Sequence, residues 1–102
     1  MIVTTTNSIP GKRIEIVGTV HKEVVFGANF IKDFFAAAVD TIGGRSRSYE
    51  KILAKGRNVA LDEIEKQAVT MGANGIIGLN MDFEFTQKMI AATAYGTAVK
   101  FG

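Results

Sequence analysis

Apolar and polar residues alternate near both ends of the chain, and apolar residues recur at helical spacing in the part between. The alternation predicts strands over residues 13–26, 77–85 and 89–101, and a short apolar start predicts another over residues 2–5. One face of the first long strand is predicted to carry Ile14, Ile16, Gly18 and Val20, with a bend at Gly18. One face of the strand over residues 77–85 is predicted to carry Ile77, Leu79, Met81, Phe83 and Phe85.

Two helices are predicted in the middle of the chain. Asn29 is the expected N-cap of the first helix, and Gly43 its C-terminal stop. The second is expected from about Ser48, as N-cap, to Met71. Gly56 lies inside it and costs about 1 kcal/mol relative to Ala. We therefore expect either a close approach of another backbone at Gly56 or a break in the helix.

The order strand, strand, helix, helix, strand, strand predicts an α+β fold. We expect one mainly antiparallel sheet with two helices packed on one face, in a single domain over residues 1–102. The last strand, however, is apolar or small on both faces, so the face without helices also has to be buried. A symmetric neighbour is the expected cover, which predicts a homo-oligomer.

Composition narrows the classes of partner. Hydrophobic residues make up 47% of a chain of only 102 residues, a surplus that agrees with association between copies. The net charge of +2 does not favour nucleic acid, and no apolar run is long enough to span a membrane. The first residues lack the pattern of a signal peptide, and cysteine is absent. We expect a cytoplasmic protein.

Residues 43–50, Gly-Gly-Arg-Ser-Arg-Ser-Tyr-Glu, carry the first candidate site. A helix N-terminus favours anions, so the candidate ligands of a phosphate or nucleotide are Arg45, Ser46, Arg47, Ser48 and Lys51. The competing interpretation is that these basic residues meet acidic groups of the same or a neighbouring subunit. We favour the second, because the turn lacks the Lys-Ser/Thr of a P-loop and follows no strand.

The charges of the second helix support a partner. Its first half is basic at Lys51, Lys55 and Arg57, and its second half is acidic at Asp62, Glu63 and Glu65. Both halves oppose the helix dipole.

A second candidate site lies on the strand over residues 77–85. Asn80, Asp82 and Glu84 share one face and offer the oxygen ligands of a hard divalent metal ion. The alternative is a solvated polar row. Soft metals prefer thiolate or imidazole, and the chain has no cysteine and only His21, so a soft-metal site within one subunit is not expected.

Five blocks of the sequence together resemble the YbjQ-like family, to which heavy-metal binding has been ascribed. They are residues 27–36, residues 43–46 with Tyr49 and Glu50, residues 72–74 with 76–78, Asp82 with Glu84, and residues 96–99. The resemblance implies a dodecin-subunit-like fold and a ring, a pentamer, whose subunits share strands. It supplies no reaction and no catalytic residue. Phe83 stands where the family commonly has Tyr, and Gly56 and Gly75 stand where it commonly has Ala.

The sequence contains no serine–histidine–acid constellation and no nucleophile elbow, so catalysis is not the favoured interpretation. We expect a ring-forming oligomer that binds a small ligand or metal ion at subunit interfaces. The alternative is an anion- or nucleotide-binding protein, or an enzyme, that uses the arginine-bearing turn.

Overall fold

A computed structural model describes residues 1–38, 44–86 and 88–102, and the side chains of these residues except those of 34–49. Its elements are β1 (Ile2–Val3), β2 (Ile14–Gly27), α1 (Ala28–Ala38), α2 (Gly44–Thr70), β3 (Gly75–Phe85) and β4 (Met89–Phe101). The predicted α+β class and the predicted order of elements are confirmed.

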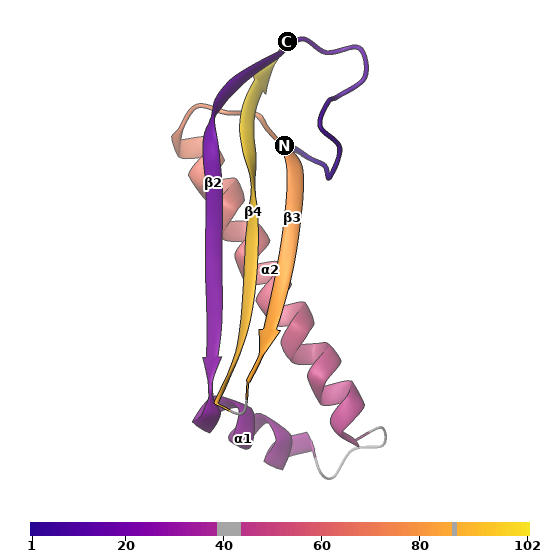
Figure 1. Cartoon of the computed structure of the whole chain (residues 1–102), viewed down its shortest axis with the longest axis vertical. Helices are drawn as coiled ribbons and strands as arrows, with labels where there is room; N and C mark the ends of the chain where they lie inside the picture. The colour runs from indigo at the N-terminus through magenta and orange to yellow at the C-terminus, as the bar shows by residue number, and fades with distance from the viewer. Residues whose placement is uncertain (39–43, 87) are drawn as a thin grey trace.

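The strands form one mixed sheet in the order β1-β3-β4-β2. β1 runs parallel to β3, whereas β4 is antiparallel to both of its neighbours. The long helix α2 crosses one face of the sheet diagonally, and α1 lies across the ends of the strands (Figure 1). One helix therefore covers the face for which we had expected two.

Both helices begin earlier than the capping residues suggested. α1 starts at Ala28, directly after β2, so Asn29 lies inside it; the predicted stop Gly43 is outside the described residues. α2 starts at Gly44, so Ser48 is a helical residue and not the N-cap. Arginine and serine cost little within a helix, so capping preference alone does not locate its first residue. α2 ends at Thr70, one residue before the predicted Met71, and Gly72 just beyond has a φ of 85°.

A bulge in β3 changes one predicted face. Gly78 has a φ of 60°, and it and Leu79 together lie opposite Gly96. This extra residue turns Ile77 to the face away from α2, while Ile76 and Leu79 pack in the core on the α2 side. The prediction that Ile77 shares a face with Leu79 was wrong, because alternation holds only while neighbouring strands stay in register.

A second bulge lies in β2 near the predicted bend. Ile16 pairs with Val99 and Gly18 pairs with Ala98, which leaves Val17 as the extra residue. Ile16 therefore lies on the opposite face of the strand from Gly18 and Val20, with which it was predicted to share a face. It is 73% exposed.

The core has two parts of different size. The larger cluster joins α2 to the part of the sheet nearer the chain termini and contains Val20, Ala60, Ile64, Ala68, Ala73, Ile76, Ala94 and Ala98. The smaller cluster lies toward α1 and contains Phe26, Ile52 and Ile90. Between them, a Cβ at Gly56 would lie 3.0 Å from Ala92 Cβ and 3.2 Å from Phe26 Cε2. α2 is continuous there, which excludes a break. The close approach at Gly56 is made by the side chains of Ala92 and Phe26 and not by another backbone.

The folded chain is long and thin. Its extents are 51 × 23 × 19 Å and its radius of gyration is 16.5 Å, against about 13 Å for a compact chain of this length. Its accessible surface is 6710 Å², against about 5,600 Å² for a compact monomer of 11.0 kDa. None of the helices in the described part of the chain is long and apolar enough to cross a membrane.

Candidate functional site

The predicted oxygen ligands lie on the face of the sheet that α2 leaves open. Asn80 pairs with Tyr95 and Asp82 pairs with Thr93, and all three predicted ligands, Asn80, Asp82 and Glu84, are exposed. The bulge at Gly78 precedes this stretch, so the alternation predicted from Leu79 to Phe85 is preserved.

The register of β4 extends this polar row across to β2. Tyr95 lies between Asn80 and His21, and Thr93 lies between Asp82 and Glu23. Thr93 Oγ1 donates a hydrogen bond to Glu23 Oε2 at 3.5 Å. We missed Glu23 in the sequence, because nothing local shows that residue 23 and residue 82 flank the same residue of β4.

One copy of the chain does not assemble a metal site from these groups. Asp82 and Glu84 are two residues apart on one strand, about 7 Å, and Asp82 and Glu23 are two strands apart, about 10 Å. These are spacings of the backbone, and flexible carboxylates two residues apart on one strand face can reach a common cation. Asp82 and Glu84 would nevertheless supply only part of a shell of about six to eight oxygen ligands. Among the residues that the structure describes, no three of His, Cys, Asp and Glu gather as metal ligands.

The donors also decide which metals fit. The open face offers carboxylates, one amide and the single imidazole of His21, without a thiolate. These residues do not fit a soft heavy metal within one copy. They fit a hard cation if several copies supply the ligands. Asn80 Nδ2 donates to the Gly78 carbonyl at 3.0 Å, which leaves the amide oxygen as the acceptor for a cation.

Gln67 of α2 fixes the backbone of β2 at His21. Its Nε2 donates to the His21 carbonyl at 2.8 Å, and its Oε1 accepts from the His21 N–H at 3.2 Å. β2 is an edge strand, so this side chain occupies backbone groups that another strand would otherwise use. The sequence alone gave no sign of this role.

The predicted anion ligands Arg45, Ser46, Arg47 and Ser48 lie at the start of α2, and their side chains fall outside the described residues. Lys51 is exposed. Anion binding here stays a prediction.

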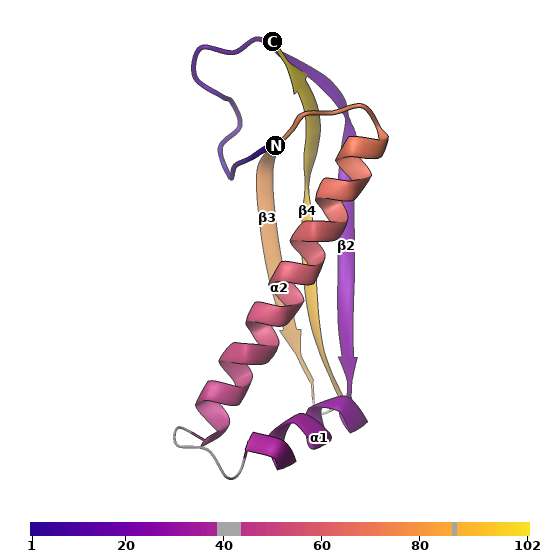
Figure 2. The same ribbon diagram turned by 180° about the vertical axis from the view of Figure 1, so that it is seen from behind.

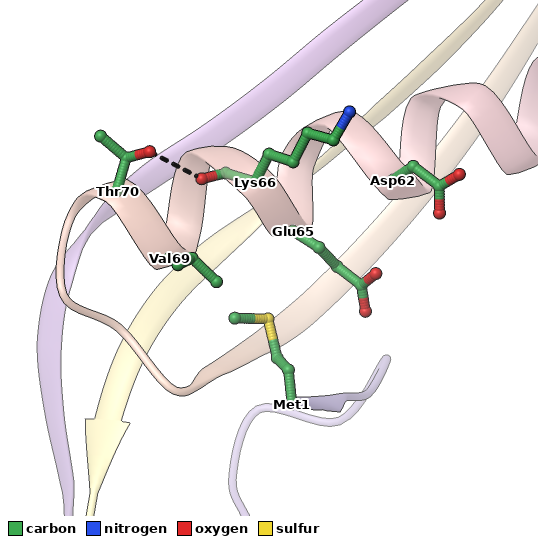
Figure 3. Close-up of a pocket in the computed structure, with 6 residues that line it drawn as sticks. All are labelled: Met1, Asp62, Glu65, Lys66, Val69 and Thr70. Atoms are coloured by element: carbon green, nitrogen blue, oxygen red, sulfur yellow. Dashed lines mark hydrogen bonds between the residues drawn. The ribbon is translucent and has the colours of Figure 1, made fainter.

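A groove that the sequence did not predict runs between Met1 and the C-terminal half of α2 (Figure 3). It is open, encloses about 680 Å³, and is lined by Met1, Asp62, Glu65, Lys66, Val69 and Thr70. Lys66 forms an ion pair with Glu63 at 3.7 Å, so its charge is shared with a residue outside the lining. The groove combines apolar side chains with the carboxylates of Asp62 and Glu65.

Comparison with known proteins decides the family. Residues 1–102 match the YbjQ family, described as "putative heavy-metal-binding". The chain belongs to this family. Relatives in the same group are UPF0145 proteins from Anoxybacillus flavithermus, 54% identical over 98% of this chain and 97% of the relative, and from Persephonella marina, 47% identical over 97% of each. The resemblance predicted from five sequence blocks is confirmed.

A solved structure shows the same fold. It is the crystal structure of a protein of unknown function from Pediococcus pentosaceus, of the DUF74 family. The TM-score is 0.71 at 18% identity, over 100% of this chain and 98% of that one. At this identity the likeness establishes the architecture of the YbjQ chain, and its function has to be argued from its own geometry.

Proposed function

We propose that this YbjQ-family protein is a ring-forming homo-oligomer that binds a divalent cation through oxygen ligands supplied by several copies. The observation that carries the proposal is the surplus surface of the subunit, 6710 Å² against about 5,600 Å² for a compact chain of its mass. Contact with a neighbouring copy of the chain is the simplest way to bury this additional surface.

Much of the uncovered surface is apolar. Phe83 and Phe85 face the side of α2, yet 39% and 52% of these residues are exposed. Val25 and Tyr95 are exposed on the opposite face. Large apolar side chains on both faces exceed what isolated soluble proteins usually leave in water.

The two edges of the sheet support a ring in particular. β1 pairs with Gly75 and Ile76, and the residues after it continue the backbone hydrogen bonds as far as Leu79. The part of β3 beyond Leu79 borders no further strand in the described part of the chain. β2 forms the other edge, which Gln67 occupies at His21. Two unlike edges favour head-to-tail contacts, and such contacts close into a ring when the rotation between copies allows it. The number five comes from the family resemblance.

The proposed cation site depends on the symmetry of the ring, which repeats the same oxygen ligands in every copy. A ring presents Asn80, Asp82 and Glu84 once per copy, so carboxylates that are too few within one copy to fill a coordination shell can be joined by those of other copies. The family description supports metal binding, and the donors in this chain favour a hard cation such as calcium or manganese.

Sedimentation equilibrium tests the assembly. We expect a mass of five times 11.0 kDa, about 55 kDa, or a multiple of it. A monomer near 11.0 kDa would overturn the ring.

Calorimetric titration of the assembled protein with calcium, manganese and zinc tests the cation site. We expect binding that the double variant Asp82→Asn and Glu84→Gln removes and the control Asp33→Asn, on α1, retains. Absence of binding at millimolar metal would end the cation proposal and leave the ring intact. A thermal shift with phosphate or a nucleotide that Arg45→Ala removes would favour the anion-binding alternative instead.

A further inference from the structure

The side of α2 that faces away from the sheet carries its own repeat. Ile52, Gly56, Ala60, Ile64 and Ala68 form the buried stripe against the sheet. On the opposite side, spacings of alternately four and three residues separate Lys51, Lys55, Asn58, Asp62, Glu65 and Val69. All of these are exposed except Glu65, which is half-buried. Residues at these spacings lie along one face of a helix.

The charges of this outer stripe are separated along the helix. Lys51 and Lys55 form its basic end, and Asp62 and Glu65 form its acidic end. Seven residues, about 10 Å along the helix axis, separate Lys55 from Asp62, so a straight helix cannot pair the two ends with each other. In the described part of the chain none of the four takes part in an ion pair. Lys55 instead lies over the ring of Phe30, with Nζ 5.2 Å from its centroid.

We propose that the outer stripe of α2 packs antiparallel against the outer stripe of a second copy, about a two-fold axis at Asn58. Reversing the order Lys, Lys, Asn, Asp, Glu places opposite charges against one another. Lys51 then lies level with the partner's Glu65, and Lys55 lies within one residue of the partner's Asp62. A two-fold contact satisfies both ends of both helices at once.

The groove beside Met1 lies at the acidic end of the stripe. Figure 3 shows the side chain of Met1 beside Val69 and Glu65. Val69 is 63% exposed, the highest value among the large apolar residues of α2. The methylene stem of a lysine covers apolar surface while its ammonium stays with a carboxylate. A Lys51 side chain from the second copy supplies both contacts in this groove.

The second copy is the favoured occupant because the same helix carries both complementary charges. This inference rests on the proposed ring, since single exposed ion pairs bind weakly and gain strength when a ring repeats them. The two-fold contact then joins two rings face to face.

Charge reversal tests the contact in the assembled protein. Native mass spectrometry at low salt should show wild-type particles of twice the ring mass. Lys51→Glu with Lys55→Glu, and separately Asp62→Lys with Glu65→Lys, should each halve that mass, because like charges then face each other. Mixing the two variants should restore the doubled mass. The control variant Lys32→Glu with Lys88→Glu changes the net charge by the same amount as the first variant, but at positions outside the outer stripe. It should keep the doubled mass. A doubled particle that neither reversal halves, or a wild type that never doubles, would overturn the helix contact.

Cross-linking separates failure of this contact from failure of the ring. The chain has no cysteine, so Asn58→Cys introduces a single thiol near the proposed axis. A short bis-maleimide should join two such copies efficiently, and it should join Arg57→Cys copies, with the thiol off the stripe, at least ten-fold less. Equal cross-linking at the two positions, or none at residue 58, would contradict the antiparallel pairing. A wild-type particle with a mass below that of five copies would overturn the ring alone. The cross-linking yield of Asn58→Cys would still decide whether the helices pair.

Discussion

The two halves of α2 differ in how they meet the sheet. In the C-terminal half, Ala60, Ile64 and Ala68 are fully buried. In the N-terminal half, Ile52 is fully buried, but the helix runs outward past β3 (Figure 2). Phe83 and Phe85 lie on the sheet face toward α2 and remain exposed. One helix thus closes the core at one end of the subunit and leaves it open at the other.

Side-chain size explains the difference. Ala60 and Ala68 allow α2 to lie close to the small residues Ala94 and Ala98 of β4. Toward α1, the ring of Phe26 lies against Gly56, and beyond this contact the buried cluster contains, among the side chains that the structure describes, Phe26, Ile52 and Ile90. The closed end stabilises the single chain, whereas the open end offers apolar surface to a partner.

The largest expected effect is at the closed end. Ile64→Ala should lower the free energy of unfolding by about 4 kcal/mol, because it leaves a cavity inside a large rigid cluster. Ile52→Ala should cost about 2 kcal/mol, since the smaller cluster can relax toward solvent. Urea unfolding monitored by circular dichroism measures both values. A larger loss at Ile52 would show that the open end carries more of the stability than we infer.

The bulge that keeps the core residues of β3 facing α2 should have a smaller effect. Gly78→Ala places a side chain at a φ of 60° and should cost about 1–2 kcal/mol. Gly27→Ala is the matched control, because Gly27 has no positive φ and a Cβ there would meet no atom within 4 Å. Urea unfolding measures the loss of unfolding free energy in both variants. Equal losses in the two would show that the bulge at Gly78 has no special effect on stability.

The smallest change in the stability of the single chain is expected at the open end. Phe85→Ser should lower the unfolding free energy of the dissociated chain by only about 1 kcal/mol, since full burial of such a side chain is worth about 1.5–3 kcal/mol and the residue is 52% exposed. It should nevertheless lower the mass of the assembly in sedimentation, because the lost apolar surface lies where a partner would bind. Phe85→Leu, which keeps an apolar side chain, should retain more of the assembly. An unchanged mass in both variants would place the interface elsewhere.

Local pattern was sufficient for the element types. Alternation identified the strands over residues 77–85 and 89–101, and the family blocks identified the YbjQ family. The helical spacing of Gly56, Ala60, Ile64 and Ala68 identified most of the face of α2 that the sheet buries, although it placed Leu53 there and not the fully buried Ile52. Alternation also placed Asn80, Asp82 and Glu84 on one face, because side chains in a strand alternate at a fixed period.

Properties that depend on contacts between distant segments came from the tertiary structure. One extra residue at Gly78 turned Ile77 away from α2, and the pairing of Thr93 with both Asp82 and Glu23 widened the polar row to β2. The two hydrogen bonds between Gln67 and His21 join residues 46 positions apart. The sequence by itself determined which residues are apolar, charged or small and the period at which they recur. Register, bulges and the diagonal path of α2 were decided only by how strands and helix pack, because each depends on the free energy of contacts made across the whole chain.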